Sequence, residues 1–304
     1  MASFKTWLEA ARLRTLPLSL SGIIVGSAIA FGNGYWDARV FWLAMLTTIL
    51  FQILSNFAND LGDSQKGTDN EHRVGPERTV QSGAVSLKQM KIAVILTSIL
   101  SFISAGALIF FGTQQMPIEM MWFYGGLAIL CVLAAITYTV GKRAYGYSGF
   151  GDIMVLIFFG FVSVLGVYSL FAKAFDTTNV LPAITIGLLS TAVLNLNNMR
   201  DYVNDKASGK VTFVVKIGPN NAKVYHTLMI LLAFTSMVAF LIRFNEPILY
   251  LSLLPFIGLG MHLRKVMGTT DPKDFDPELK VVALSTFAIS VLFGVLIAFI
   301  LPLL

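Results

Sequence analysis

Residues 40–69, VFWLAMLTTILFQILSNFANDLGDSQKGTD, join a long apolar run to a cluster of acidic and amide side chains. The run over 40–59 is about as long as a helix that crosses the hydrocarbon core of a bilayer, which takes roughly 20 residues. The polar cluster begins where this run ends. The stretch therefore predicts a membrane-spanning helix that carries a polar site at its mouth.

The rest of the chain repeats this apolar pattern. Of its 304 residues, 56% are hydrophobic and only 13% are charged, whereas soluble domains carry about 25% charged residues. The sequence therefore predicts an all-α, polytopic membrane bundle, and we treat residues 1–304 as a single membrane domain. Nine stretches are each about long enough to span a bilayer: residues 16–32, 40–59, 92–112, 119–140, 152–172, 181–198, 227–242, 246–262 and 281–301.

The positive charges indicate how such a bundle is oriented. With the N-terminus placed inside, 19 of the 22 Lys and Arg residues fall in the inner segments, which are residues 1–15, 60–91, 141–151, 199–226 and 263–280. Short loops rich in Lys and Arg stay in the cytoplasm. We therefore expect a multi-pass protein of the cytoplasmic (inner) membrane, with a cytoplasmic N-terminus and the C-terminus on the opposite side. The basic residues form no aromatic-interleaved patch, so the expected surroundings are membrane lipid and not nucleic acid.

One cluster of polar residues follows the sixth apolar stretch. Asn197, Asp201 and Asp205 stand at positions i, i+4 and i+8, so on a continuing helix they share one face. Like charges at this spacing repel each other unless a cation lies between them. A few hard oxygen ligands, with room left for water and phosphate, are typical of a Mg²⁺ site that is shared with a substrate.

A similar cluster ends the second apolar stretch. Asn59 and Asp63 are again separated by four residues, and we expect the helix to end near Gly67 so that a turn brings Asp69 back toward them. Asp60 is a fourth possible ligand. Two such clusters, each with Mg²⁺, would form a clamp for a diphosphate. Loop acids without any function are the alternative interpretation, but scattered acids have no reason to keep helical register with a preceding Asn.

Basic residues accompany both clusters. Guanidinium groups match phosphate oxygens with two parallel donors, and lysines act as point charges. The positive-inside bias alone would also place Lys and Arg in these loops. The basic residues that lie where a diphosphate would need them are Arg73, Arg78, Lys142, Arg143, Lys206 and Lys210. Arg12 and Arg14, just before the first span, could serve either purpose.

Several of these motifs resemble those of one known family. NDLGDSQKGTD, followed by RVGPERTVQSG, resembles the first Asp-rich motif of the UbiA superfamily of intramembrane prenyltransferases. The spacing Asn-x3-Asp-x5-Asp is similar to that of the branch that prenylates 1,4-dihydroxy-2-naphthoate in menaquinone synthesis. The likeness extends in order along nearly the whole chain, through WLEAARLRTLPLSLSGIIVG, YTVGKRAYGYSGFGDIMVLIFFG and LLSTAVLNLNNMRDYVNDKASGKVTFVVKIG.

The resemblance implies a fold and a reaction. The fold would be nine transmembrane helices around a central cavity with cytoplasmic cap loops. The reaction would join a polyprenyl group from polyprenyl diphosphate to the naphthoate ring, with loss of diphosphate and CO₂. Water would quench an allylic cation, so a dry site is part of this chemistry.

The resemblance also implies site residues. Mg²⁺ would be held by Asn59, Asp63 and Asp69 on one side and by Asn197, Asp201 and Asp205 on the other. Lys142 and Tyr138 join the four aspartates as catalytic candidates, because a tyrosine ring face can stabilise a cation. The candidates for substrate binding are Arg14, Asn56, Asp60, Arg73, Arg78, Tyr145, Tyr147, Asn198, Lys206 and Lys210.

Two alternatives remain at this stage. A prenyltransferase of the same class could use another aromatic acceptor, such as 4-hydroxybenzoate or homogentisate. A cation-coupled transporter would also have many spans and inward-facing acids, but transporters place ionisable residues mid-span or break helices there. In this chain the acids stand at helix mouths and the mid-span positions are almost free of charge.

Overall fold

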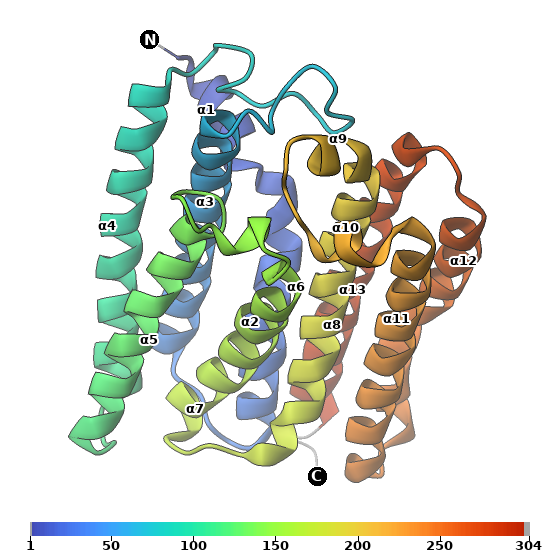
Figure 1. Cartoon of the computed structure of the whole chain (residues 1–304). Coiled ribbons are helices and arrows are strands. Elements are labelled where there is room, and N and C mark those ends of the chain that lie inside the picture. The colour runs from blue at the N-terminus through green and yellow to red at the C-terminus, as the bar shows by residue number, and fades with distance from the viewer. Residues whose placement is uncertain (1, 301–304) are drawn as a thin grey trace.

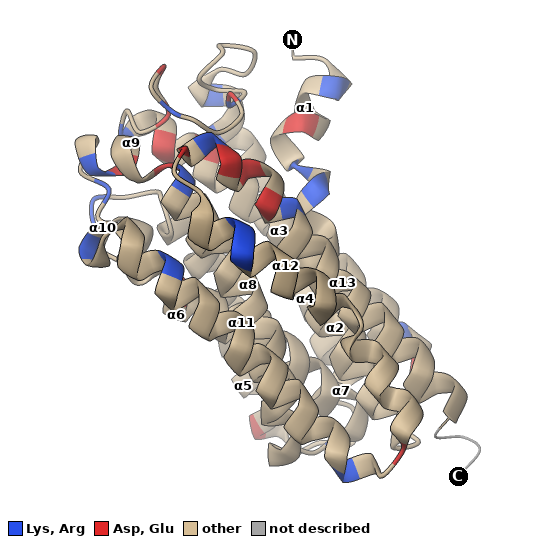
Figure 2. Ribbon diagram, turned by 90° about the vertical axis from the view of Figure 1, so that its right-hand side faces the viewer, with Lys and Arg blue, Asp and Glu red and all other residues tan. Residues whose placement is uncertain are grey.

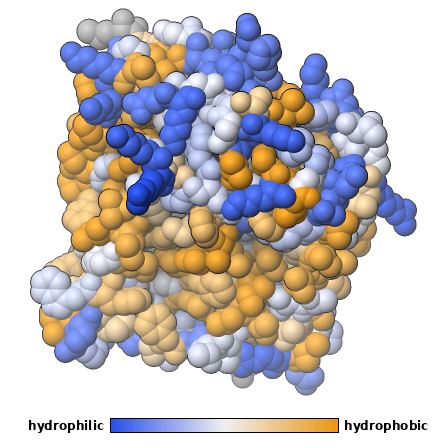
Figure 3. Space-filling model, viewed as in Figure 1, coloured by the Kyte–Doolittle hydropathy of each residue, from blue (hydrophilic) through white to orange (hydrophobic). Residues whose placement is uncertain are grey.

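The computed structural model describes residues 2–300, and within that range it contains helices, turns and loops but no strand. The helices lie roughly side by side and form one bundle (Figure 1). Nine segments of the described chain are long and apolar enough to cross a membrane, which confirms the predicted number; residue 301, the expected end of the last span, lies outside the described residues. Apolar residues, coloured orange, predominate across the middle of the face shown in Figure 3.

The spans are built from the following elements. The first contains α1, the short turn η1 and α2, the fifth contains α6, η3 and α7, and the eighth contains η6 and α12. The bounds are α1 Phe4–Ala11, η1 Leu13–Thr15, α2 Leu16–Gly32, α3 Ala38–Gln65, α4 Leu87–Gly112, α5 Ile118–Thr137, α6 Gly151–Val155, η3 Leu156–Gly166, α7 Val167–Ala172, α8 Val180–Arg200, α9 Tyr202–Ala207, α10 Phe213–Ile217, α11 Pro219–Leu241, η6 Pro247–Leu253, α12 Pro255–Gly268 and α13 Phe275–Ile300.

Local sequence explains where several helices begin. Helix α4 starts with a capping box, in which the Ser86 side chain accepts from Gln89 N while the Gln89 side chain accepts from Ser86 N. Helices α2, α11 and α12 each carry a proline in the first turn, where its missing N–H costs no helical hydrogen bond.

Small residues allow the central helices to pack closely. Helix α8 packs against α11, α13 and η3, and α13 also packs against α2. Gly160 of η3 faces Gly187 of α8, and a Cβ at Gly160 would lie only 2.5 Å from Ala183 O. Glycines at such a contact let the two backbones approach each other, as in other membrane bundles.

The charged side chains are concentrated at one end of the bundle. Figure 2 shows Lys, Arg, Asp and Glu gathered around α1, α9, α10 and the loop after α3. Helix α1 lies at this end, whereas α13 runs from it to the opposite end (Figure 1). The distribution matches the asymmetry of the sequence, in which most Lys and Arg residues fall on one side.

Candidate active site

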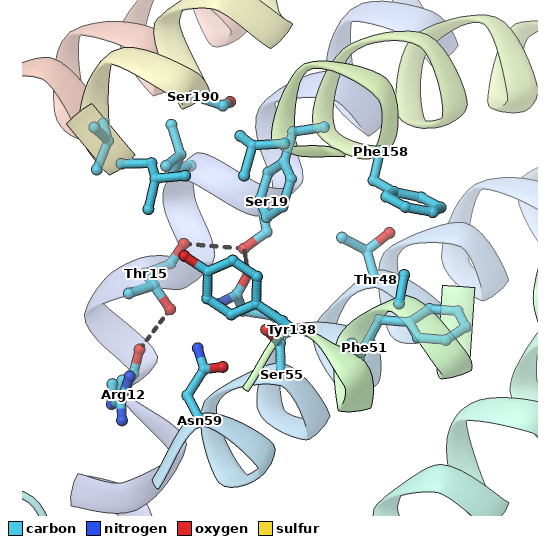
Figure 4. Close-up of a pocket in the computed structure, with 18 of the residues that line it drawn as sticks. Arg12, Thr15, Ser19, Thr48, Phe51, Ser55, Asn59, Tyr138, Phe158 and Ser190 are labelled. Atoms are coloured by element: carbon cyan, nitrogen blue, oxygen red, sulfur yellow. Dashed lines mark hydrogen bonds between the residues drawn. The ribbon is translucent and has the colours of Figure 1, made fainter. Parts of the chain in front are cut away.

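A cavity of about 920 Å³ opens at the charged end and runs into the bundle. Polar residues line its mouth, and apolar residues from α2, α3, α4, α5 and η3 line the interior. Figure 4 shows the side chains of Phe51, Ser55, Asn59 and Tyr138 directed into this space. Its size is that of a pocket for a small organic ligand, and its two-part lining suits a molecule with a charged head and an apolar tail.

One wall of the cavity comes from an unusual helix. Residues Leu156–Gly166 wind as a π-helix, which is rare and occurs often at functional sites. Its lining residues recur about every four positions, close to one turn of this helix, so they form a stripe along the wall: Phe158, Phe159, Val162, Ser163 and Gly166.

Residues from three spans line the deep end of the cavity. Tyr124 of α5 donates a hydrogen bond to Gly166 O at 3.4 Å and its hydroxyl contacts Ser169 Oγ. Leu108 and Leu170 are also buried here and line the cavity. The lining at the end away from the charged mouth is therefore mainly apolar.

The first acidic cluster forms as the sequence predicts. Helix α3 ends at Gln65, and Gly67 takes a left-handed conformation with φ of 70°, which suits glycine because it has no Cβ. The chain then turns back, so that Thr68 N and Asp69 N both donate to Asp63 O, at 3.0 and 3.4 Å. The turn brings Asp69 beside Asp63, and both side chains are buried.

The second cluster departs from the prediction of a continuing helix. Helix α8 ends at Arg200, and α9 begins only after Asp201. The three residues still follow one another at helical spacing, because Asp201 N donates to Asn197 O at 3.0 Å and Asp205 N donates to Asp201 O at 2.8 Å. Asp201 and Asp205 are buried, and Asn197 lines the cavity.

Two cations join the clusters to each other. Arg73 lies 3.3 Å from Asp69 Oδ1 and 3.7 Å from Asp201 Oδ2. Lys210 Nζ lies 3.6 Å from Asp63 Oδ2 and 3.9 Å from Asp205 Oδ1. The structure therefore places both clusters around one entrance, where they are close enough to share a ligand.

Asp60 has a different environment from the other acids. It forms ion pairs with Arg12 and Arg78, the latter at 3.3 Å, and accepts a hydrogen bond from Thr79 Oγ1 at 3.1 Å. Its carboxylate is thus occupied by protein donors. Asp60 lines the cavity, but its oxygens are less available to a metal than those of Asp69.

The aspartates behind the entrance have perturbed protonation. Burial, with a contribution from the charge of Asp63, raises the pKa of Asp69 to about 7. Burial raises the pKa of Asp205 to about 7 as well, although Lys210 acts in the opposite direction. Both oxygens of Asp69 and Oδ2 of Asp205 accept no hydrogen bond. Buried carboxylate oxygens without donors are costly, and a bound cation would satisfy them.

The donor set fits Mg²⁺ better than a metal that prefers a complete protein cage. Within residues 2–300, no three His, Cys, Asp or Glu side chains are arranged to hold a metal by themselves. Mg²⁺ usually takes only one or two carboxylates and completes its shell with water and substrate phosphates. The amide oxygens of Asn59 and Asn197, both at the cavity wall, are further oxygen donors of the kind that Mg²⁺ accepts.

Three tyrosines surround the entrance. Tyr138 and Tyr145 line the cavity, and their ring centroids are 5.3 Å apart. The hydroxyl of Tyr147 donates to Asp63 Oδ1 at 2.7 Å and lies 2.6 Å from Thr68 Oγ1, away from the cavity lining. Lys66 Nζ lies 3.8 Å from the centroid of the Tyr147 ring. Tyr147 thus contacts a carboxylate of the first cluster, whereas Tyr138 faces the open space.

Some candidates lie away from the cavity. Lys142 and Lys206 are exposed and do not line it, because Lys142 follows a turn at Gly141 and Lys206 lies on the outer face of α9. Asn198 is buried outside the lining. Asn56 instead joins α3 to the first span, since its Nδ2 donates to Ala11 O at 2.9 Å.

The remaining basic candidates are at the mouth. Arg14, Arg73, Arg78 and Lys210 all line the cavity. Arg12 lines it too, and it contacts Asp60.

Sequence reasoning missed Arg200. Its side chain is 3% exposed and donates to Asn197 Oδ1 and to both oxygens of Asp201. The only local signal was its place between these two residues, at i+3 from Asn197.

Known proteins resemble this chain over nearly its full length. The model of the UbiA prenyltransferase family matches residues 19–287. The 1,4-dihydroxy-2-naphthoate octaprenyltransferase of Haemophilus influenzae is 42% identical, with 95% of this chain and 94% of that protein covered. The protein of the same description from Escherichia coli is 43% identical, with 91% and 89% covered.

Solved structures share the fold. The apo structure of a UbiA homolog from Aeropyrum pernix has a TM-score of 0.71 at 17% identity, covering 94% of this chain and 98% of that one. A UbiA homolog from Archaeoglobus fulgidus bound to GPP and Mg²⁺ has a TM-score of 0.59 at 15% identity, covering 93% and 99%. The family match, the relatives and the shared fold agree, and this chain belongs to the UbiA prenyltransferase family.

Proposed function

We propose that this protein transfers a polyprenyl group from polyprenyl diphosphate to 1,4-dihydroxy-2-naphthoate, which gives demethylmenaquinol, CO₂ and diphosphate. The observation that carries the proposal is the meeting of two acidic clusters at the mouth of one largely apolar cavity, where they share Arg73 and Lys210. The naphthoate acceptor is supported by relatives of that description at 42% and 43% identity.

The donor would bind with its charged head at the mouth. Arg73, Arg78 and Lys210 line this part of the cavity and are directed at the acidic clusters. Their donors match phosphate oxygens. The prenyl tail would then lie along the π-helix stripe toward Tyr124, where apolar walls favour its burial.

A metal would be held by residues from both clusters. The proposed ligands are Asn59, Asp63 and Asp69 from α3 and its loop, and Asn197, Asp201 and Asp205 from α8 and α9. When bound, Mg²⁺ supplies Lewis-acid stabilisation of the charge that develops on the leaving diphosphate.

The remaining chemistry concerns the reacting carbons. The allylic C–O bond breaks, and its electron pair leaves with the diphosphate. The ring carbon that bears the carboxylate forms the new C–C bond, and the electron pair of the C–carboxylate bond returns to the ring as CO₂ departs. No net proton is gained or lost. We propose that the Tyr138 ring, which lines the cavity, stabilises the allylic cation, and that the apolar walls exclude water.

We also propose an orientation in the membrane. The end that carries α1, α9 and α10 would face the cytoplasm, because most of the Lys and Arg residues are there. The start of α1 and the end of α13 would then lie on opposite sides of the cytoplasmic (inner) membrane. The chain would act as a single membrane domain that meets both substrates from the charged end.

An assay with two acceptors tests the proposal. Membranes that contain the protein would receive radiolabelled polyprenyl diphosphate with 1,4-dihydroxy-2-naphthoate or 4-hydroxybenzoate, in Mg²⁺ or in EDTA. We expect product only with the naphthoate and only in Mg²⁺. Product from the benzoate alone would reassign the acceptor, and the absence of any metal-dependent product would reject the enzyme.

Two variants test the site itself. Asp63→Asn and Asp201→Asn should each lower turnover about a hundredfold or more, because each removes a negative charge that would help to hold the metal. The metal stabilises the transition state by several kcal/mol. Glu71→Gln is the matched control, since Glu71 lies in the same loop with its side chain 86% exposed. Near-normal turnover in either Asp variant would remove that residue from the proposed metal site.

A further inference from the structure

An ion pair connects the last helix of the bundle to the second acidic cluster. Asp276 stands in the first turn of α13, and its Oδ1 lies 2.5 Å from Arg200 Nη1 at the end of α8. The Arg200 side chain is 3% exposed and the Asp276 side chain 39% exposed. Both residues line the mouth of the cavity.

Arg200 uses its other nitrogens on two of the proposed metal ligands. Its Nη2 donates to Asn197 Oδ1 at 2.8 Å and to Asp201 Oδ2 at 2.8 Å, and its Nε donates to Asp201 Oδ1 at 3.0 Å. Arg200 and the Asp201 carboxylate thus form a bidentate pair, which fixes the orientation of the carboxylate as well as its distance from the guanidinium. Each oxygen keeps a further lone pair, so the contacts orient the ligands without occupying them fully.

The guanidinium is held from two sides. Asp276 contacts it from α13, and the loop after α3 packs against it at Gly75. A Cβ at Gly75 would lie 2.5 Å from Arg200 Nη2. Without Asp276, Nη1 of Arg200 would lose its charged partner, and a buried donor left without an acceptor is unfavourable. The guanidinium would then be anchored only by Asn197 and Asp201, so the contact with α13 would no longer fix its position and theirs.

We propose that Asp276 is a positioning residue, which acts through Arg200 to hold the oxygens of Asn197 and Asp201 in the geometry that binds a metal–diphosphate head group. The proposal rests on the proposed function only for the identity of that head group. Hydrogen-bonding partners of metal ligands typically change metal affinity or activity by 10- to 100-fold when they are removed. We therefore expect the loss of Asp276 to change mainly the Mg²⁺ concentration that the enzyme needs, and the maximal rate less.

The test compares Asp276→Asn with Asp274→Asn. Asp274 is an exposed acid two residues earlier in the same segment, so its substitution removes the same charge without touching Arg200. We expect Asp276→Asn to raise the Mg²⁺ concentration for half-maximal turnover by about tenfold or more, with the maximal rate largely recovered at high Mg²⁺. Asp276→Glu, which keeps the charge, should restore much of the Mg²⁺ affinity, and Asp274→Asn should match the unmodified protein.

A binding measurement separates this proposal from the proposed function. Calorimetric titration of the detergent-solubilised protein with inorganic diphosphate in the presence of Mg²⁺ needs no acceptor and no turnover. A weaker Mg²⁺-dependent affinity in Asp276→Asn alone would support the proposal even if the naphthoate assay failed. An affinity and a Mg²⁺ dependence equal to those of Asp274→Asn would overturn it, and so would a lower maximal rate with an unchanged Mg²⁺ dependence.

Discussion

Arg73 Nη2 lies 3.7 Å from Asp201 Oδ2, so a loop from the first half of the chain partly neutralises a carboxylate from the second half. Arg73 and Asp201 are both buried side chains, 6% exposed each. Charges in such surroundings interact more strongly than at a surface. The two acidic clusters therefore form one electrostatic unit, in which a change at one cluster is felt at the other.

Diphosphate and Mg²⁺ are expected to bind cooperatively. In the absence of metal, Arg73 and Lys210 are engaged by carboxylates, so they are less available to a phosphate. Mg²⁺ on those carboxylates would release both cations. Inorganic diphosphate should bind on the order of tenfold or more tightly when Mg²⁺ is present, as measured by calorimetry. Equal affinity with and without Mg²⁺ would contradict the shared arrangement.

Mg²⁺ affinity should rise with pH through neutrality. The pKa of Asp69 and that of Asp205 are both raised to about 7, mainly by burial. A carboxyl group must lose its proton to bind a metal. Between pH of about 6 and 8, each displaced proton should change the apparent Mg²⁺ affinity by up to about tenfold per pH unit. Titrations in buffers of different ionisation enthalpy would detect the released protons, and a flat pH profile would show that neither group titrates there.

The same two groups predict how the metal-free protein responds to pH. A carboxyl group with a raised pKa binds more protons in the folded state than in the unfolded state, so stability falls as pH rises. For Asp69 and Asp205 the fall should extend from about pH 4 to about pH 7, with up to about 1.4 kcal/mol per pH unit for each group. Thermal unfolding in EDTA at several pH values would measure it. The double variant Asp69→Asn/Asp205→Asn should flatten the profile, and a profile that stays as steep would assign the effect to other groups.

Gly75 should be sensitive to a single added methyl group. A Cβ there would lie 2.8 Å from Arg73 Nη2 and 2.5 Å from Arg200 Nη2, so Gly75→Ala would displace the guanidinium groups that contact both clusters. We expect turnover and Mg²⁺ affinity to fall while the melting temperature changes little. Gly125→Ala is the control, because its Cβ would meet no atom within 4 Å. Full activity in Gly75→Ala would show that the loop can move without cost.

The path of the prenyl tail can be tested by filling the cavity. Ala128 of α5 is buried and lines the apolar part, so Ala128→Phe would obstruct it. We expect kcat/KM for long polyprenyl diphosphates to fall about tenfold or more, since this removes apolar contact area, whereas dimethylallyl diphosphate should be affected little. Leu130→Phe is the matched control on the same helix, where the side chain is 57% exposed. An equal loss for short and long donors would place the tail elsewhere.

Features that depend on local sequence were predicted well. The number of spans follows from apolar length, and the turn at Gly67 follows from a glycine placed after a helical pattern. In the second cluster, backbone hydrogen bonds still join Asp201 to Asn197 and Asp205 to Asp201, four residues apart. The helix itself, which was expected to continue, stops at Arg200. Spacing along a chain cannot reveal where a helix end is interrupted by contacts with other segments.

The sequence predicted that the two acidic clusters would meet, but it did not predict which other side chains from distant segments would contact them. Lys142 and Lys206 were proposed from their loops, yet both side chains are exposed, because the direction of a loop side chain is set by how the loop packs. Asp276 carried no local signal at all, and the role proposed for it rests on the approach of α13 to Arg200.

By itself, the sequence predicted nine spans, and residues 2–300 contain nine helices long and apolar enough to cross a membrane. It also predicted that two acid-bearing helix ends lie at the same end of the bundle. Apolar length, helical register and charge bias can be read from residues that are close together in the sequence. Only the tertiary structure decided which cations those acids share, which oxygens remain without a donor and which residues line the apolar cavity. Such contacts join residues from opposite halves of the chain, and it is the packing of the helices against one another that brings them together.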